Sequence, residues 1–161
     1  MKILTDNFSW WEVKCRCCGR LPEDDQMVLV LADRLQTIRN KVGDKIKITS
    51  WFRCSKHNSE VGGSPASKHL SGAAADIYIP SLSLLEAFSL CAFDGEHLFG
   101  GVGAYPSDGI IHVDLRIQRI CWIKHKDVYQ YMDKEEAIAY LINLDKNRRF
   151  AKAMEDVEYG G

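Results

Sequence analysis

The stretch that decides the fold reads SKHLSGAAAD over residues 67–76, and a second stretch, IIHVD, covers residues 110–114. Together they offer two histidines and one aspartate, His69, Asp76 and His112. Two neutral imidazoles and one carboxylate give zinc three protein ligands and leave the fourth tetrahedral position for a water whose pKa falls toward neutrality. An open position is typical of a catalytic zinc ion, so the two stretches predict a zinc hydrolase.

Hydrophobic periodicity predicts a helix and two strands around the first stretch. Apolar residues recur at helical spacing over residues 27–42, after an acidic pair and before Gly43, which is typical of an amphipathic helix with ordinary ends. Residues 46–49 and 76–79 alternate in the manner of half-buried strands. We therefore expect a loop to present His69 and Asp76 to lie at the beginning of the second strand.

A hairpin is predicted around the second stretch. Residues 101–105 and 110–115 flank the turn sequence PSDG. Successive side chains of a strand leave opposite faces of the sheet, so His112 and Asp114 share a face. A short helix is expected after Ser83, and the pattern after Trp122 turns helical again.

Length and charge narrow the function classes. The 161 residues suit one domain, and 21 basic residues nearly balance 22 acidic ones, so charge favours neither nucleic acid nor an anionic membrane as a partner. Polar residues interrupt the first seven residues, and no segment approaches the roughly 18 apolar residues of a membrane span. We expect synthesis in the cytoplasm without a signal peptide.

Six cysteines are many for a cytosolic chain and too unevenly spaced for a disulfide framework. Cys15 and Cys18 have the two-residue spacing of structural zinc sites, and Cys54 or Cys121 could complete a set. The usual second Cys-x-x-Cys is missing. The sequence therefore favours free buried thiols, or a disulfide formed after export, over a second, structural zinc ion at Cys15 and Cys18.

Four blocks of sequence resemble zinc peptidase family M15, which includes D-Ala-D-Ala carboxypeptidases and phage endolysin-type peptidoglycan peptidases. The family pattern S-x-H-x-x-G-x-A-x-D is matched by Ser67, His69, Gly72, Ala74 and Asp76. The other blocks are TSWFRCSKHN with the following VGG, then GVGAYP, and HVDLR, over residues 49–63, 101–106 and 112–116. Phe8 and Ser9, followed by the cysteines, are similar to members encoded by phages and prophages.

The resemblance implies an α+β fold: a small antiparallel sheet that bears the zinc site, flanked by helices, similar to hedgehog domains and DD-peptidases. We expect a single peptidase domain over residues 1–161 and a monomer. Its motif-bearing core would cover about 24–123, after a cysteine-rich segment, 1–23, and before a helical extension, 124–161.

The resemblance also implies roles for individual residues. His69, Asp76 and His112 would bind zinc, and Ser67 and Arg53 would hold the substrate carbonyl as negative charge develops on it. Arg53 could instead grip a terminal carboxylate or be a solvated surface residue. Trp51 and Tyr105 adjoin motif blocks, so we expect them near the cleft.

The general base is less settled in the sequence. Several relatives place an acidic residue three positions before the last histidine ligand, and this chain has Gly109 there. Asp114 is the first choice for the base and Asp108 the second. Asp114 could instead accept the spare N–H of a ligand histidine and fix its tautomer.

The predicted function is that of a zinc metallopeptidase hydrolysing peptidoglycan stem peptides, as a D-Ala-D-Ala carboxypeptidase or an endopeptidase. A chain without a leader suits a phage or prophage lysin, which a holin would release or a virion would carry to the cell wall. The alternative is a non-catalytic zinc-binding virion or recognition protein that keeps the M15-like site, as hedgehog domains do. Retention of Arg53 and Ser67 argues against it, because a purely structural zinc ion needs neither.

Overall fold

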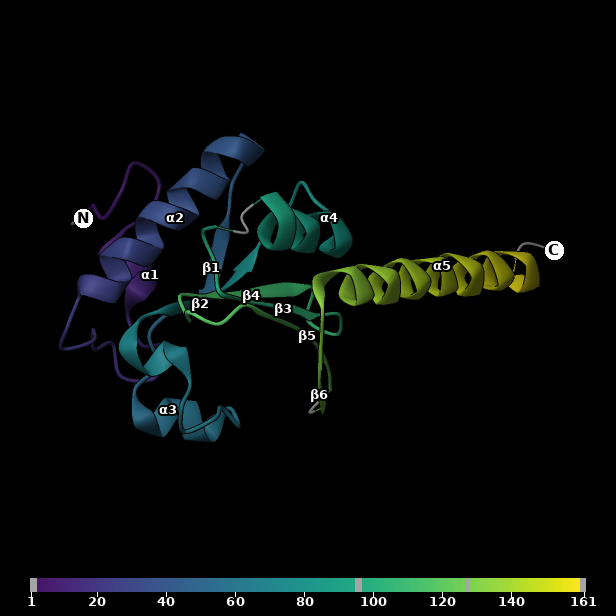
Figure 1. Ribbon diagram of the computed structural model, residues 1–161. Coiled ribbons are helices and arrows are strands. Elements are labelled where there is room, and N and C mark those ends of the chain that lie inside the picture. The colour runs from purple at the N-terminus through teal and green to yellow at the C-terminus, as the bar shows by residue number, and fades with distance from the viewer. Residues whose placement is uncertain (1–2, 95–96, 127, 160–161) are drawn as a thin grey trace.

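The computed structural model describes residues 3–94, 97–126 and 128–159 (Figure 1). Residues 1–2 and 160–161, the ends of the expected single domain, lie outside the described residues. The elements are α1 Trp10–Val13, α2 Gln26–Val42, β1 Lys47–Ser50, α3 Ser55–Glu60, η1 Lys68–Ser71, β2 Ala74–Tyr78, α4 Leu84–Ser89, η2 Leu90–Asp94, β3 Gly101–Tyr105, β4 Ile110–Asp114, β5 Ile120–His125, β6 Val128–Met132 and α5 Lys134–Tyr159.

The described strands form one sheet in the order β1-β2-β4-β3-β5-β6. Its neighbours are antiparallel except β3 and β5, which are parallel. The chain leaves β4, crosses the end of β3 and enters β5 on the far side, where Ile120 N–H donates to Gly100 C=O at 2.9 Å. The expected α+β class, with a sheet flanked by helices, is confirmed, and this crossover is the departure from a purely antiparallel sheet.

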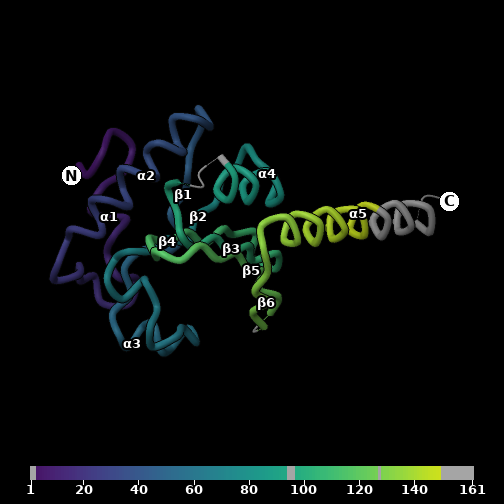
Figure 2. The backbone as a smooth tube through the Cα atoms, viewed as in Figure 1, coloured from purple at the N-terminus to yellow at the C-terminus, as the bar shows by residue number. Residues whose placement is uncertain are grey.

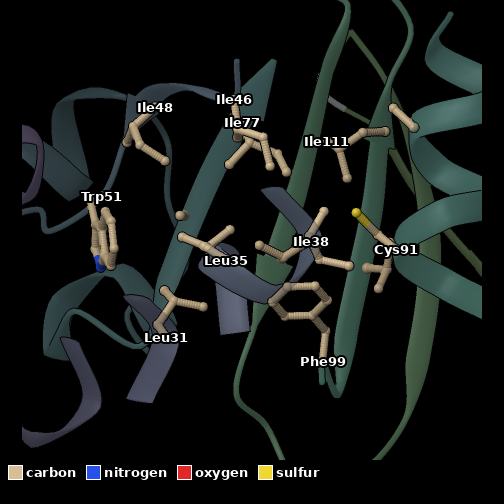
Figure 3. Packing of buried hydrophobic residues seen from close by; sticks show 14 of the residues in the cluster. Leu31, Leu35, Ile38, Ile46, Ile48, Trp51, Ile77, Cys91, Phe99 and Ile111 are labelled. Atoms are coloured by element: carbon tan, nitrogen blue, oxygen red, sulfur yellow. The ribbon is translucent and has the colours of Figure 1, made fainter. Parts of the chain in front are cut away.

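Helix α2 covers one face of the sheet and ends where the sequence predicts. Gly43 adopts a left-handed φ of 69° and donates its N–H to Arg39 C=O, which closes the last turn. Leu35 and Ile38 are fully buried and point toward Ile77 and Ile111 of the sheet (Figure 3). Burial of these side chains supplies the main apolar stabilisation at this face.

The two faces of the sheet differ in chemistry because strand side chains alternate. In β4, Ile111 and Val113 belong to the apolar core, while His112 and Asp114 leave the opposite face. In β2, the side chain of Ile77 likewise belongs to the apolar core, and that of the preceding Asp76 leaves the opposite face of the sheet. Figure 1 shows α2 and α4 on the core side and α3 on the other side of the sheet, so the polar residues collect beside α3 and η1.

The structure departs from the helical pattern expected after Trp122. Strands β5 and β6 form an antiparallel pair before α5 begins. Four of the five residues of β6 are exposed, so neither face of this edge strand is packed in the core.

Helix α5 follows the edge strand and contacts both α4 and β5. Ala137 and Leu141 are buried there, and the helix then extends away from the rest of the molecule (Figure 2). Within the described part of the chain, none of the helices combines the length and apolar character that a membrane crossing needs.

Candidate metal site and cleft

Strand register places the candidate site in one row across the sheet. Asp76 is paired with His112, His112 with Gly103, Gly103 with Trp122, and Trp122 with Tyr131. Residues paired across neighbouring strands share a face. Two candidate ligands and two aromatic rings therefore lie on one side of the sheet.

The third candidate ligand comes from η1, the short helix just before β2. Ser67 caps this helix by accepting the N–H of His69 at 3.4 Å, and Gly72 closes it with a left-handed φ of 71°. Both the backbone and the ring of His69 contact the segment between β1 and α3. Arg53 N–H donates to the His69 C=O at 3.1 Å, and the ring nitrogen Nδ1 of His69 lies 2.6 Å from Trp51 C=O. The sequence predicted His69 in a loop and Asp76 at the beginning of a strand, but His69 lies in the short helix η1 and Asp76 is the middle residue of β2.

His69, Asp76 and His112 are all buried, and their ligand atoms come together in a compact triangle. Asp76 Oδ1 lies 2.9 Å from His112 Nδ1 and 3.3 Å from His69 Nε2, and the two ring nitrogens are 3.2 Å apart. Tetrahedral zinc with bonds of about 2.0–2.1 Å to nitrogen and oxygen holds neighbouring ligand atoms about 3.3–3.4 Å apart. The three residues therefore fit one face of a zinc coordination tetrahedron.

The tautomers of the two histidines follow from the acceptors around them. His69 Nδ1 faces Trp51 C=O and His112 Nε2 faces Asp114 Oδ2 at 3.2 Å, so both of these nitrogens carry hydrogen. This leaves lone pairs on His69 Nε2 and His112 Nδ1, which point at each other and at the Asp76 carboxylate. Such a set of donors needs a shared cation, either a proton or a metal ion.

Without a metal ion, the surroundings of the three groups shift their pKa values in different directions. Burial lowers the pKa of His69, and it stays below its ordinary value. Burial also disfavours the charged form of His112, but its hydrogen bonds with Asp114 and Asp76 outweigh this and raise its pKa. Burial alone would raise the pKa of Asp76, yet the electrostatic influence of His69 and His112 beside it holds this pKa well below its usual range.

Arg53 forms a hydrogen bond with Oδ2 of Asp76, the carboxylate oxygen that does not face the histidines. Its Nη2 donates to Asp76 Oδ2, and its Nε donates to Ser50 Oγ at 2.9 Å. These two contacts take two of the five N–H groups of the guanidinium. The same side chain lines the cleft beside His69, which leaves N–H groups for a ligand there.

Asp114 is fully buried and is fixed by Arg116. The Arg116 side chain donates Nε and Nη2 to the carboxylate at 2.5–2.9 Å, and its backbone N–H donates at 3.0 Å. Burial acts to raise the pKa of Asp114, but hydrogen bonds from His112 and Arg116 lower it far below its ordinary value. Asp114 is absent from the residues that line the cleft.

Two glycines of β3 make room for these groups. A Cβ on Gly101 would lie 2.5 Å from Asp114 Oδ2, and one on Gly103 would lie 2.4 Å from the Trp122 ring. Because Gly103 has no side chain, the Trp122 ring crosses it and approaches His112, with 5.1 Å between ring centroids. The sequence GVG at 101–103 is thus required by side chains of the neighbouring strands.

A cleft of about 1020 Å³ runs over the site, and its lining includes Arg53, Ser67, His69, His112 and Tyr105. The cationic side chains in its lining are Arg53, Lys68 and Arg116, and among the described lining residues none is acidic. Its aromatic side consists of Tyr105, Trp122, Tyr129 and Tyr131.

The structure places the other sequence candidates outside this cleft. The expectation that the Trp51 ring lies near the cleft is wrong, since the ring is buried in the core and donates Nε1 to Gly72 C=O at 2.9 Å. Of Trp51, only the backbone carbonyl contacts the candidate site, where it lies beside Nδ1 of His69. Asp108 is exposed in the β3–β4 turn and is not part of the cleft lining.

Tyr129, Tyr131 and Arg116 are among the cleft residues that the sequence did not single out. Tyr129 and Tyr131 lie on β6, a strand that the sequence did not reveal, although their two-residue spacing was a signal for it. Arg116, in the HVDLR block, could have been singled out by its closeness to Asp114 in sequence.

Comparison with known proteins agrees with this geometry. The sequence model described as Peptidase M15 matches residues 7–114, more than half of the chain, and this range contains all three candidate ligands. No curated protein matches the chain. The chain belongs to the Peptidase M15 family.

Proposed function

We propose that the protein is a zinc metallopeptidase that hydrolyses peptide bonds of peptidoglycan stem peptides. The observation that carries the proposal is the triangle of His69, Asp76 and His112, which lies under a cleft together with Arg53 and Ser67. Membership of a peptidase family supports hydrolysis, and the donor set supports zinc.

Zinc would be held by His69 Nε2, Asp76 Oδ1 and His112 Nδ1. Bound there, zinc would act as a Lewis acid that polarises the scissile carbonyl and lowers the pKa of a bound water. The protein's part is to keep three donors aimed at one point: Trp51 C=O orients His69, Arg53 orients Asp76, and Asp114 orients His112.

Arg53 and Ser67 are the proposed donors to the substrate oxyanion. Both line the cleft beside His69, and Arg53 is held in place by Ser50 and Asp76. The Ser67 hydroxyl accepts the His69 N–H with its oxygen, so its own hydrogen can be donated. Donors fixed before the substrate binds need no reorganisation when charge develops.

For Asp114 the geometry favours the positioning role over the role of general base. Its carboxylate is fully buried and engaged by Arg116 and by His112. Such a group fixes the His112 tautomer and strengthens it as a ligand. Asp108, the second candidate, remains a proposal: it lies on a turn and would have to reach the cleft when substrate binds.

The cleft suits an acidic peptide. Arg53, Lys68 and Arg116 face it without an acidic residue among the described lining, and stem peptides carry free carboxylates. The tyrosines of β6 and Trp122 offer flat apolar surface to the rest of the substrate. Both carboxypeptidase and endopeptidase cleavage fit this surface. A phage or prophage lysin, delivered to the wall by a holin or a virion, is the setting that we propose for it.

One observation favours a second candidate, a recognition protein that binds zinc and the stem peptide without cleaving it. The described cleft lining has no carboxylate to serve as a base, which agrees with Gly109 at the position where relatives have an acid.

Digestion of purified peptidoglycan separates the two candidates. We expect zinc-loaded protein to release fragments whose masses identify the cleaved bond, and His69→Ala to release none. His97→Ala, with its substitution outside the cleft lining, is the matched control and should cleave normally. Tight binding of stem peptide by folded, zinc-loaded protein without any fragment would establish the recognition protein instead.

A further inference from the structure

A second group of metal-binding side chains lies outside the cleft. The Sγ atoms of Cys15, Cys17, Cys18 and Cys54 all lie within 4.8 Å of one another. Cys15 and Cys17 are 3.6 Å apart, and Cys17 and Cys54 are 3.5 Å apart, sulfur to sulfur. The chain brings these thiols together over 37 residues from Cys17 to Cys54, so local sequence alone does not explain the cluster.

We propose that these four cysteines form a structural zinc site. Tetrahedral zinc with Zn–S bonds of about 2.3 Å sets its sulfur atoms about 3.8 Å apart, close to the separations found here. A complete set of four protein ligands is typical of structural zinc, in contrast to the three ligands of the cleft. The proposal does not depend on the proposed function, because it concerns different residues and different donor atoms.

The turn that carries three of the thiols has the shape such a site needs. Gly19 adopts a left-handed φ of 70° and donates its N–H to Cys15 C=O at 2.8 Å, while Cys15 N–H donates to Arg20 C=O at 2.9 Å. The chain from Cys15 to Gly19 therefore curls tightly, and the thiols of Cys17 and Cys18 turn back toward Cys15. Glycine is the residue that adopts this conformation without a steric cost.

Hydrogen-bond donors surround the sulfur atoms. Cys54 N–H donates to Cys15 Sγ, and His57 N–H donates to Cys54 Sγ, each at 3.4 Å. The His57 ring nitrogen Nδ1 lies 3.4 Å from Cys15 Sγ and donates to it in the tautomer that carries hydrogen there. N–H donors offset the negative charge that gathers where several thiolates share one ion, as hydrogen bonds around bound ligands do in other metal sites.

The proposed ion would fasten the amino-terminal segment to residues 51–54, the loop between β1 and α3. Cys54 directly follows Arg53, and Phe52 N–H donates to Val13 C=O at 3.2 Å, two residues before Cys15. The same loop supplies Trp51 C=O to His69. Zinc at the cysteines would hold Arg53 and this carbonyl in place from outside the cleft, and binding energy at such sites is folding energy.

The sequence favoured free thiols or a disulfide, because it offered only one Cys-x-x-Cys pair. The structure adds Cys54 to the amino-terminal cysteines and shows that Cys121 is not part of the cluster. None of the six cysteines, all of which lie in the described part of the chain, forms a disulfide.

Metal content and cobalt spectra test the proposal. Protein purified under a non-thiol reductant should contain two zinc ions per chain by elemental mass spectrometry, and His69→Ala should contain one. Cobalt bound to His69→Ala should show the intense near-ultraviolet band of sulfur-to-cobalt charge transfer, which the nitrogen and oxygen donors of the cleft cannot produce. This arm needs no change in the cysteines and is independent of peptidase activity.

Substitutions locate the site. Cys17→Ser changes an exposed side chain, so its loss of the cobalt band would not come from a core defect, and Cys18→Ser provides a second exposed variant. The matched control, Cys121→Ser, should keep both zinc ions and the band. His69→Ala with no zinc and no band, an unaltered band in Cys17→Ser and Cys18→Ser, or a disulfide among these cysteines in protein isolated from the cytoplasm, would each overturn the proposal.

Discussion

The carboxylate of Asp114 lies 3.2 Å from Nε2 of His112 and holds the histidine from the side opposite its candidate metal. The other ring nitrogen, Nδ1, lies 2.9 Å from Asp76 Oδ1. One imidazole is thus fixed at both nitrogens between two carboxylates of neighbouring strands. If zinc binds as proposed, its affinity should therefore depend on the position of Asp114.

Asp114→Asn should weaken zinc binding by about 10–100-fold, as loss of such supporting hydrogen bonds does elsewhere. Activity should recover when zinc is raised, because the cleft itself is unchanged. Competition with a zinc indicator gives the affinity, and kcat at saturating zinc gives the chemistry. Unchanged zinc affinity with a kcat that stays low at saturating zinc would identify Asp114 as the general base instead.

Gly101→Ala should also weaken zinc binding, because the added Cβ would displace the Asp114 carboxylate. Its Cβ would meet the Asp114 carboxylate oxygens at 2.5 and 2.6 Å and displace them from His112. We expect a clear loss of zinc affinity, measured by the same competition. Gly109→Ala is the control: a left-handed φ of 68° in open space costs it about 1–2 kcal/mol of stability without touching the site. Equal zinc affinities for the two variants would argue against this role of Gly101.

Arg53→Lys should lower kcat on the order of a hundredfold, the usual cost of removing an oxyanion donor. A lysine keeps the charge but cannot reach Ser50, Asp76 and a substrate together with one planar group. Lys56→Ala on α3, whose side chain is exposed, is the control for charge near the cleft and should leave kcat unchanged. A normal kcat with a raised KM in Arg53→Lys would indicate that Arg53 grips a substrate carboxylate.

Tyr131→Ala should raise KM several-fold and leave zinc content unchanged, because Tyr131 lines the cleft without contacting a ligand residue. Tyr78→Ala, a partly exposed tyrosine of β2 outside the cleft lining, is the matched control. The measurement is steady-state hydrolysis of a soluble stem peptide. If both variants kept the wild-type KM, the aromatic side of the cleft would have no part in substrate binding.

Zinc affinity should fall as the pH is lowered, and the pH at which it begins to fall should depend on the pKa of His112. Its hydrogen bonds with Asp114 and Asp76 outweigh burial and raise its pKa, so on acidification a proton competes for Nδ1 at a higher pH than for an ordinary histidine. In Asp114→Asn the competition should begin at lower pH, since one cause of the raised pKa is lost. Zinc titrations at a series of pH values check this, and an onset that does not move would refute the assignment to His112.

Local sequence patterns predicted one helix and one hairpin of the fold, but not the edge of the sheet. Helix α2, the β3–β4 hairpin and the shared face of His112 and Asp114 follow from local periodicity and turn residues, and the structure confirms them. Strand β6 was missed although Tyr129 and Tyr131 are two residues apart, because the pattern after Trp122 was interpreted as helical throughout. Its two cleft tyrosines were missed for the same reason.

Relationships across the sheet also stayed out of reach of the sequence. The close approach of Trp122 to His112 depends on Gly103 lying between them in the register. The clustering of Cys17 with Cys54 depends on the path of the chain before α2. Both are tertiary placements that no local pattern encodes.

Hydrolysis, as proposed, depends on a metal ion held by His69, Asp76 and His112. The most direct measurement removes zinc with a chelator, restores it in steps, and follows both peptide hydrolysis and bound metal. We predict no hydrolysis by metal-free protein and recovery in proportion to zinc bound at this site, with none in His69→Ala at any zinc concentration. Full hydrolysis by the metal-free protein, or normal recovery in His69→Ala, would contradict the account.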